Sequence, residues 1–545
     1  MAPLLHEGIG VSDSPEQLER IGYVIGEASP THFYFLADEG IHPPRWEYVV
    51  VKSKEFVDGR EVEVFIVAQI YEIVSLSLAL DLSNRPSLEA VERLIRAHLV
   101  DKRLIAKARV LGFVHNGEVL QPRRAIHPGN VVYRAPSHIL KEFYSYPDEE
   151  GLFIGYLITR SDVPVSISIR GFRRHLAILA QTGAGKSYTA GVLLEELLKK
   201  GATIIVLDPH ADYVFMSRKK DGGKFTDRVT VFRTRESTGR YTKEHIGRIE
   251  TYEIKFSDLT IEEIATVCGI SERWTNIISA IERAINELKK QNTHYSLEDL
   301  IEKLNNKQDQ HSLAALKYVR RLRRIRVFGD ATTDIRKLLK PKHISVVDLS
   351  GLDDEVADYI TYRILSDVFE IVRTQEYNYP VFLFIEEAHR FIPNKESTLS
   401  KRIIKRIAAE GRKFGLFLTV ITQRPYKIDP DVLSQCNSQI ILRMTNPEDQ
   451  NAVRRSSERM SEDLLRDLPG LNVGEAIIVG EITKAPVMVK IRHRETEEGG
   501  ADIDVISKLK EALKEAEEEE TSLIKKINEE LSLIHISEPT RPLYI

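Results

Sequence analysis

The stretch Leu176–Leu194 has the sequence LAILAQTGAGKSYTAGVLL. It begins as an apolar run, breaks into small and polar residues, and becomes apolar again with helical spacing. A glycine-rich turn between a buried strand and a helix lets backbone N–H groups converge on phosphate oxygens at the helix N-terminus. The stretch therefore predicts a phosphate-binding loop. Such a loop alone fits kinases, GTPases, transporters and motors equally well, so the rest of the sequence must decide.

Length and composition limit the class of protein. The chain has 545 residues, of which 42% are hydrophobic and 29% charged, which indicates a globular protein of about three or four folding units. It contains no apolar run of 18 residues, and residues 1–17 lack the basic flank and apolar stretch of a signal peptide, so we expect a cytoplasmic protein. Two cysteines, Cys268 and Cys436, exclude a disulfide scaffold. The net charge of −4 means that a nucleic-acid surface must be a local patch.

The pattern of apolar runs predicts an α/β protein with an N-terminal β domain. Residues 1–150 contain short β-rich runs between turn residues, typical of a small barrel, with one helical stretch, SLEAVERLIRAHL. In residues 151–258 and 336–495 apolar strands alternate with helices, which predicts a doubly wound core around a parallel sheet. Residues 259–335 lack a comparable strand signal and predict an all-helical insertion.

The C-terminal segment, residues 496–545, has a different composition. It begins with EEGGAD and continues as a helix rich in lysine and glutamate that is expected to end near Leu531. This pattern favours a solvated or coiled extension over a core element. Residues 532–545 drop the charged helical pattern abruptly and are excluded from the fold prediction.

The phosphate-binding loop supplies specific chemistry. Gly183 and Gly185 allow the close backbone approach, Lys186 would reach the β and γ phosphates of ATP, and the Ser187 hydroxyl would bind Mg²⁺. Ala180 stands where the usual eight-residue pattern has its first glycine. The predicted nucleotide-binding residues are Thr182, Gly183, Ala184, Gly185, Lys186, Ser187 and Tyr188.

Two adjacent acids follow another buried strand. In FLFIEEAH, Phe382–His389, an unbroken apolar run leads into Glu386 and Glu387. Strand ends of parallel sheets open into the nucleotide crevice, so we expect Glu386 to serve Mg²⁺, together with Ser187, and Glu387 to polarise the attacking water. The alternative is a surface turn with two solvated acids.

Two further polar residues belong to the predicted catalytic set. Gln423 ends the next apolar strand in ITQRP, where its amide could contact a γ phosphate or hold the water. Arg412 lies in the glycine-flanked segment AAEGRKFGL. An arginine inserted into a neighbouring subunit's site can raise the rate roughly 10³- to 10⁵-fold, although an exposed arginine at a helix end is the alternative. Arg173 and Arg174 could likewise reach a nucleotide across a subunit interface, or they could be ordinary surface charge.

Three basic segments are candidates for contact with a nucleic-acid backbone. Arg218–Lys243 contains nine basic residues and three acids, and Lys317–Arg326 contains six basic residues and no acid. In the second segment the arginines could instead be the solvated side of a helix whose other face is apolar. Asn394–Arg402 follows the acidic strand, from which the nucleotide state could move a loop. Because these residues suggest no base-reading geometry, we expect sequence-independent contact.

The order of these motifs resembles a known family. LAQTGAGKS, LFIEEAH, EGRKFG and VITQRP, after an N-terminal β domain, are similar to the HerA branch of the HerA and FtsK superfamily of ring ATPases, over about residues 10–495. The resemblance implies a RecA-like core, an N-terminal HAS barrel, and a hexameric archaeal-type translocase or helicase on double-stranded DNA. It also implies ATP and Mg²⁺ as ligands and a NurA-type nuclease as partner in DNA end resection and homologous recombination repair.

The resemblance also assigns roles to individual residues. It implies that Lys186 and Ser187 clamp the nucleotide and that Glu386 and Glu387 form the acidic pair. Gln423 would then be the sensor, and Arg412 the finger acting in trans. Two alternatives remain open: a conjugation-type or other superfamily ATPase that moves single strands or protein, and a scaffold for a nuclease that ATP switches without turnover.

Overall fold

A computed structural model describes residues 18–81, 86–271, 273–291, 294–307, 309–457, 459–499 and 505–536. The chain divides into two compact units, residues 1–498 and 499–545, and each is described by itself. Within the described ranges, no helix is both long and apolar enough to cross a membrane.

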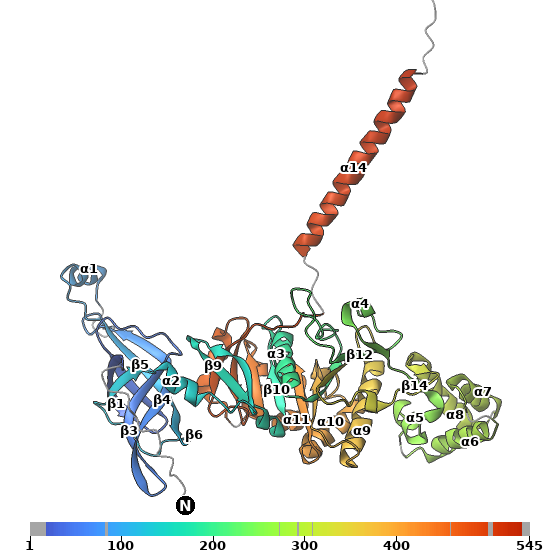
Figure 1. The fold of residues 1–545 in the computed structure, drawn as a ribbon, viewed down its shortest axis with the longest axis horizontal. Helices are drawn as coiled ribbons and strands as arrows, with labels where there is room; N and C mark the ends of the chain where they lie inside the picture. The colour runs from blue at the N-terminus through green and yellow to red at the C-terminus, as the bar shows by residue number, and fades with distance from the viewer. Residues whose placement is uncertain are drawn as a thin grey trace, which may run out of the picture. The chain divides into compact units, whose positions relative to one another are not determined.

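The first strands form a closed barrel (Figure 1). They are β1 (Arg20–Ala28), β2 (His32–Ala37), β3 (Tyr48–Val57), β4 (Arg60–Leu76), β5 (Arg103–His115), β6 (Glu118–Leu120) and β7 (Val131–Arg134). The strands follow the order β2-β1-β7-β3-β4-β5, and antiparallel pairing of β2 with β5 closes the barrel. Side chains that alternate along the strands, such as Phe33 and Phe35 on β2, are fully buried inside it. The predicted barrel is confirmed.

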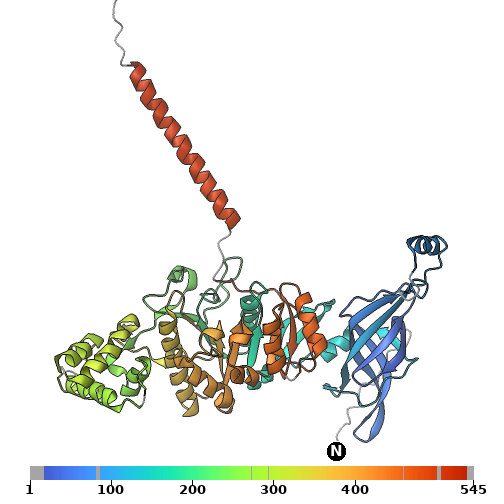
Figure 2. The same ribbon diagram turned by 180° about the vertical axis from the view of Figure 1, so that it is seen from behind.

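The second sheet is the core of the molecule (Figure 2). Its strands are β8 (Gly151–Leu157), β9 (Arg160–Ser168), β10 (Leu176–Leu179), β11 (Thr203–Asp208), β12 (Val229–Arg233), β13 (Ile249–Thr251), β16 (His343–Asp348), β17 (Val381–Ile385), β18 (Leu416–Thr422), β19 (Ser438–Leu442), β20 (Glu475–Val479) and β21 (Val487–Ile491). The part β13-β12-β16-β11-β17-β18-β10-β19 is parallel. The strands β20, β21, β8 and β9 extend it with antiparallel pairs.

Helices cover both faces of this sheet. On β10, Leu176 and Ile178 pack into one apolar cluster with α3 (Lys186–Lys199), whereas Ala177 and Leu179 pack into a second cluster with α9 (Asp354–Arg373) and α10 (Leu399–Glu410). Coverage on both faces explains why strands such as β17, VFLFI, are apolar at every position and buried throughout. The remaining α-helices of this part are α2 (Ser137–Phe143), α4 (Lys243–Ile246), α11 (Pro430–Gln435), α12 (Pro447–Ser456) and α13 (Glu462–Asp467).

The predicted helical insertion is present. It consists of α5 (Ile261–Val267), α6 (Thr275–Gln291), α7 (Leu297–Lys307) and α8 (Gln310–Val319), followed by a 3₁₀ turn at Arg320–Arg324. A short parallel pair, β14 (Ile254–Lys255) with β15 (Phe328–Gly329), joins the chain entering the insertion to the chain leaving it. The architecture is therefore the predicted α/β core with a small β-barrel and an all-helical insertion.

Some element boundaries differ from the expectation. The basic segment Arg218–Lys243 contains β12, whose first four residues are buried. Between β9 and β10, a 3₁₀ turn occupies Ile169–Arg174. The charged C-terminal helix, α14 (Val505–Ile536), continues beyond Leu531, and residues 537–545 lie outside the described part. In the barrel, α1 (Leu88–Arg96) is capped by Ser87 and buries none of its side chains.

Candidate nucleotide site

The loop after β10 has the backbone of an anion-binding nest. Gly183 and Gly185 have φ angles of 74° and 99°, in the left-handed region that favours glycine, and Gly185 is the N-cap of α3. These conformations turn successive N–H groups toward one point at the positive end of the helix dipole. Ala180 is buried and donates its N–H to Thr422 O at 3.3 Å, so the missing first glycine does not disturb this geometry.

Lys186 lies between the two predicted acids. Its Nζ is 3.0 Å from Glu387 Oε1 and forms a second, short ion pair with Glu386. All three side chains are nearly inaccessible to solvent, and that of Glu386 is 0% exposed. The contact arises because β10 and β17, which are separated in the sheet only by β18, end at the same edge.

Glu387 is held as an ionised carboxylate. Burial alone would raise its pKa, but the imidazole of His389 and the Lys186 ammonium outweigh burial and lower the pKa to about 2. His389 Nδ1 lies 3.2 Å from Glu387 Oε2 and 3.1 Å from Thr422 Oγ1. The backbone of Glu387 is left-handed, with φ of 48°, which is uncommon for a residue other than glycine and recurs at functional sites.

The loop after β11 brings in two residues that the sequence analysis missed. Asp212 Oδ2 accepts a 2.7 Å hydrogen bond from Ser187 Oγ, and the Tyr213 hydroxyl donates to Glu386 Oε2 at 2.6 Å. Asp208, at the end of β11, fixes this loop by accepting the N–H groups of both residues at 3.0 and 2.9 Å. The segment PHADY, directly after the apolar run ATIIVLD, was the signal available.

Gln423 and Tyr188 have different surroundings. Thr182 Oγ1 donates a 2.5 Å hydrogen bond to Gln423 Oε1, which ties the glycine-rich loop to the end of β18. The Tyr188 hydroxyl instead accepts the backbone N–H of Arg494 at 2.7 Å. Of the predicted nucleotide-binding residues, Tyr188 therefore directs its hydroxyl to the C-terminal segment of the core and not to the loop.

Arg412 lies at the opposite edge of the sheet. It precedes β18, whereas Gln423 follows that strand, and a strand of seven residues spans roughly 20 Å. Arg412 and Lys413 line a cavity of about 580 Å³ together with Arg173 and Arg174, which likewise precede β10. Arg174 pairs with Glu481 at 3.1 Å. Among the described residues, Arg173, Arg412 and Lys413 have no carboxylate within ion-pair distance.

The three basic segments differ in the contacts that their basic side chains make. Lys220 Nζ stacks over the Tyr188 ring at 4.7 Å, beside the P-loop helix. In the third segment, Lys401 is held by Pro393 O at 2.6 Å and by Asp429 at 3.2 Å. In the second segment, Leu322 is buried and the arginines around it are exposed, as expected for one solvated face.

These features define a P-loop ATPase core. A glycine-rich loop follows one strand of a parallel sheet, and an acidic pair that contacts the lysine of this loop follows another strand. Family models for the HerA helicase central domain and the HerA-like helicase C-terminal domain match residues 152–368 and 317–495. The chain belongs to the HerA helicase family, and it is an ATP-hydrolysing enzyme of the helicase or translocase class.

Named relatives cover nearly the whole chain. The DNA double-strand break repair helicase HerA of Pyrococcus furiosus is 30% identical over 90% of this chain and 96% of its own length. The Saccharolobus solfataricus protein of the same name is 31% identical over 90% and 95%. A solved structure, VirB4 of Thermoanaerobacter pseudethanolicus, superimposes with a TM-score of 0.46 at 19% identity, covering 64% of this chain and 98% of that one.

Proposed function

We propose that this chain is the subunit of a hexameric, ATP-driven motor on double-stranded DNA, which acts with a NurA-type nuclease in end resection and recombination repair. Support for a role in DNA repair comes from the relatives, which are named double-strand break repair helicases. The observation that carries the ring assembly is the separation of Arg412 from Lys186 at opposite edges of one sheet.

The separation matters because ATP cleavage needs cations around the γ phosphate. In one subunit Lys186 is the cation of the glycine-rich loop itself, while Arg173, Arg412 and Lys413 line a cavity at the far edge of the sheet. A head-to-tail ring closes this gap, because each subunit then presents its far edge to the loop edge of its neighbour. Arg412 acts in trans in this arrangement, and one subunit alone holds an incomplete site.

Within one subunit the proposed roles follow from the contacts. Lys186 exchanges its carboxylate partners for the β and γ phosphates when ATP binds, which frees Glu387 to polarise the attacking water. Gln423, linked to Thr182, senses the γ phosphate. The oxygens of Ser187, Asp212 and Glu386 suit Mg²⁺, which prefers oxygen ligands and would neutralise phosphate charge.

The test is ATP turnover by the purified chain with and without blunt duplex DNA, at increasing salt. We expect stimulation by duplex that falls as salt rises, because phosphate contacts release counterions. Glu387→Gln should retain nucleotide binding and lose about 10²-fold or more in turnover. Turnover that is indifferent to DNA at every salt concentration would contradict the proposal, and stimulation by unfolded polypeptide in place of duplex would favour a protein-moving ATPase.

A further inference from the structure

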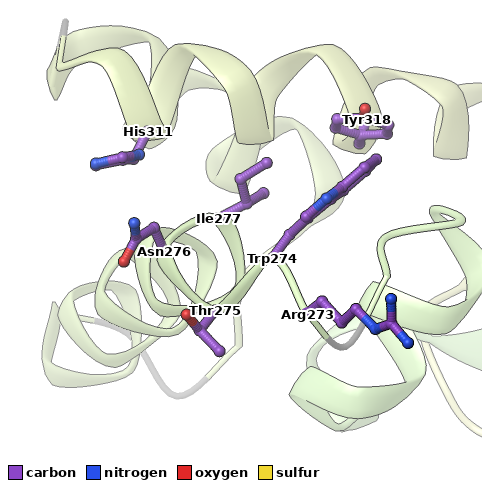
Figure 3. A pocket seen from close by; sticks show the side chains of 7 residues that line it. All are labelled: Arg273, Trp274, Thr275, Asn276, Ile277, His311 and Tyr318. Atoms are coloured by element: carbon purple, nitrogen blue, oxygen red, sulfur yellow. The ribbon is translucent and has the colours of Figure 1, made fainter.

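The helical insertion contains an aromatic cavity far along the chain from the nucleotide-binding residues. Its volume is about 290 Å³, and its lining comes from the turn before α6, the first turn of α6 and one face of α8. Figure 3 shows Trp274 directed toward Tyr318, with Ile277 between the indole and His311 and with Asn276 beside His311. His311 and Tyr318 lie seven residues apart on α8, which places both on one side of the helix.

Trp274 is exposed although its backbone is fixed. Its N–H bonds to Ser271 O at 2.8 Å, and its carbonyl accepts the N–H groups of Ile277 and Ile278 at 3.0 and 3.1 Å. The side chain is nevertheless 43% exposed, with its ring centroid 5.5 Å from that of Tyr318. A large aromatic side chain that is open to solvent beside a cavity, on a backbone held by these hydrogen bonds, is a surface suited to a flat ligand.

Basic side chains lie next to the aromatic pair in the chain. The Arg321 guanidinium lies 5.1 Å from the Tyr318 ring centroid. In the described part of the chain, Lys317, Arg320, Arg321 and Arg324 are exposed and form no ion pair, whereas Arg323 and Arg326 are paired with Glu298 and Glu236. Two of the six basic residues in this run are therefore neutralised, and the other four remain available to anions.

These features together fit one ligand class. Sequence-tolerant binding of single strands combines aromatic side chains that stack on bases with cations that hold the phosphates. The cavity is at the small end of ligand sites, so it suits a single base, and the amide of Asn276 and the ring nitrogens of His311 can bond a base edge. We propose that Trp274 and Tyr318 bind an unpaired base of single-stranded DNA while Arg321 and Arg324 contact the adjacent phosphates.

This proposal rests on the proposed action on DNA and extends it, because it gives the insertion a contact with a separated or resected strand. The assay uses the two tryptophans of the chain, Trp46 and Trp274. In the full-length Trp46→Phe variant, fluorescence reports on Trp274 alone. We expect oligo(dT) to quench it, and we expect a duplex hairpin of the same length to have a much smaller effect.

Affinity for labelled oligo(dT) is then compared among variants by anisotropy. Trp274→Ala should weaken binding about 5- to 150-fold, and Trp274→Phe should retain most of it. Replacing both Arg321 and Arg324 by glutamine should reduce the salt slope of log K by about 1.4. The matched control is Leu313→Ala, which removes an exposed apolar side chain of α8 that does not line the cavity.

The proposal is overturned if Trp274→Ala binds oligo(dT) as tightly as the parent, or if duplex and single strand quench Trp274 equally. Duplex-stimulated ATP turnover is measured on the same preparations. If duplex DNA still stimulates ATP turnover but Trp274→Ala does not change the affinity for oligo(dT), only the proposed single-strand site is wrong. If duplex DNA does not stimulate ATP turnover by the unaltered chain, the proposed DNA motor is wrong.

Discussion

Asp212 is the side chain that most changes the expected metal chemistry of the site. The sequence assigned Mg²⁺ to Ser187 and Glu386, but Glu386 is engaged by Lys186 and Tyr213, while Asp212 contacts the Ser187 hydroxyl directly. We expect Asp212→Asn to weaken Mg²⁺ affinity in the presence of ADP about 10- to 100-fold, with the affinity for metal-free ADP little changed. Titration of Mg²⁺ against a fluorescent ADP analogue measures both quantities.

The control for this experiment is Asp221→Asn, an exposed aspartate in the basic segment after β11. It should leave both affinities unchanged. If Asp212→Asn and Asp221→Asn titrate alike, Asp212 does not hold the metal, and its contact with Ser187 only positions the loop.

The raised pKa of Asp208 predicts that the free energy of unfolding depends on pH. Burial is the main cause that raises its pKa to about 7, and Asp212 and Asp348 add repulsion that the N–H groups of Tyr213 and Asp212 partly offset. The folded chain therefore binds a proton that the unfolded chain releases near pH 4. This contribution is fully present below about pH 4 and is lost as pH rises through about 7.

Asp208→Asn should remove that contribution, with a slope of at most about 1.4 kcal/mol per pH unit between pH 4 and 7. Thermal unfolding midpoints of the parent and the variant, measured across this range, test the slope apart from any constant loss of stability. Parallel curves would show that Asp208 does not titrate as described.

The sequence could predict those residues whose position follows from strand ends. Lys186 and Glu386 meet because apolar strands before each of them belong to one parallel sheet, and the ends of such strands share an edge. Asp212 stands four residues beyond the end of β11, in a loop whose path depends on the backbone bonds to Asp208. No periodicity encodes that path, so its contact with Ser187 required the structure.

At the scale of elements, α3 is clamped by the chain after β21. Arg492 pairs with Glu195 and Glu196 at 2.9 and 2.8 Å, and the fully buried Arg494 crosses α3 at Gly191. A Cβ on Gly191 would lie 2.4 Å from Arg494 Nε. Close approach of this side chain is therefore the reason for a glycine inside a helix, where glycine normally costs about 1 kcal/mol.

Gly191→Ala should consequently destabilise the core by about 1–3 kcal/mol, although helix propensity alone predicts the opposite sign. Thermal unfolding measures the effect. The clash disappears in the Gly191→Ala, Arg494→Ala double variant, so the two losses should be less than additive. Full additivity would mean that Arg494 is not the obstacle.

Element pairing was harder to predict than element type. The apolar runs of the barrel and the core correspond to strands, because burial on one face leaves an alternating pattern and burial on both faces leaves a continuous apolar run. The closing pair β2–β5 and the antiparallel pair β21–β8 depend on partners far apart in the chain. The period of a strand indicates which face is buried and does not identify the neighbour.

At the scale of the whole molecule, the decisive prediction concerns the division of one active site between two subunits. Arg412→Ala leaves the loop of its own subunit intact and removes the cation offered to a neighbour, while Lys186→Ala does the reverse. Each variant alone should lose most of its turnover, since every site in its ring lacks one cation. Each variant should still assemble, because neither side chain belongs to the apolar clusters that hold the core together.

Mixing the two variants separates action in trans from action within one chain. In a mixed ring, some interfaces combine a normal loop edge with a normal far edge, so part of the ATP turnover should return and should peak near equal proportions. A matched mixture of Glu387→Gln with Lys186→Ala should show no rescue, because both side chains belong to the same loop edge of one subunit. If the Arg412→Ala mixture also stays inactive while size measurements show exchanged subunits, Arg412 does not act across the interface, and the far-edge cluster must have another role.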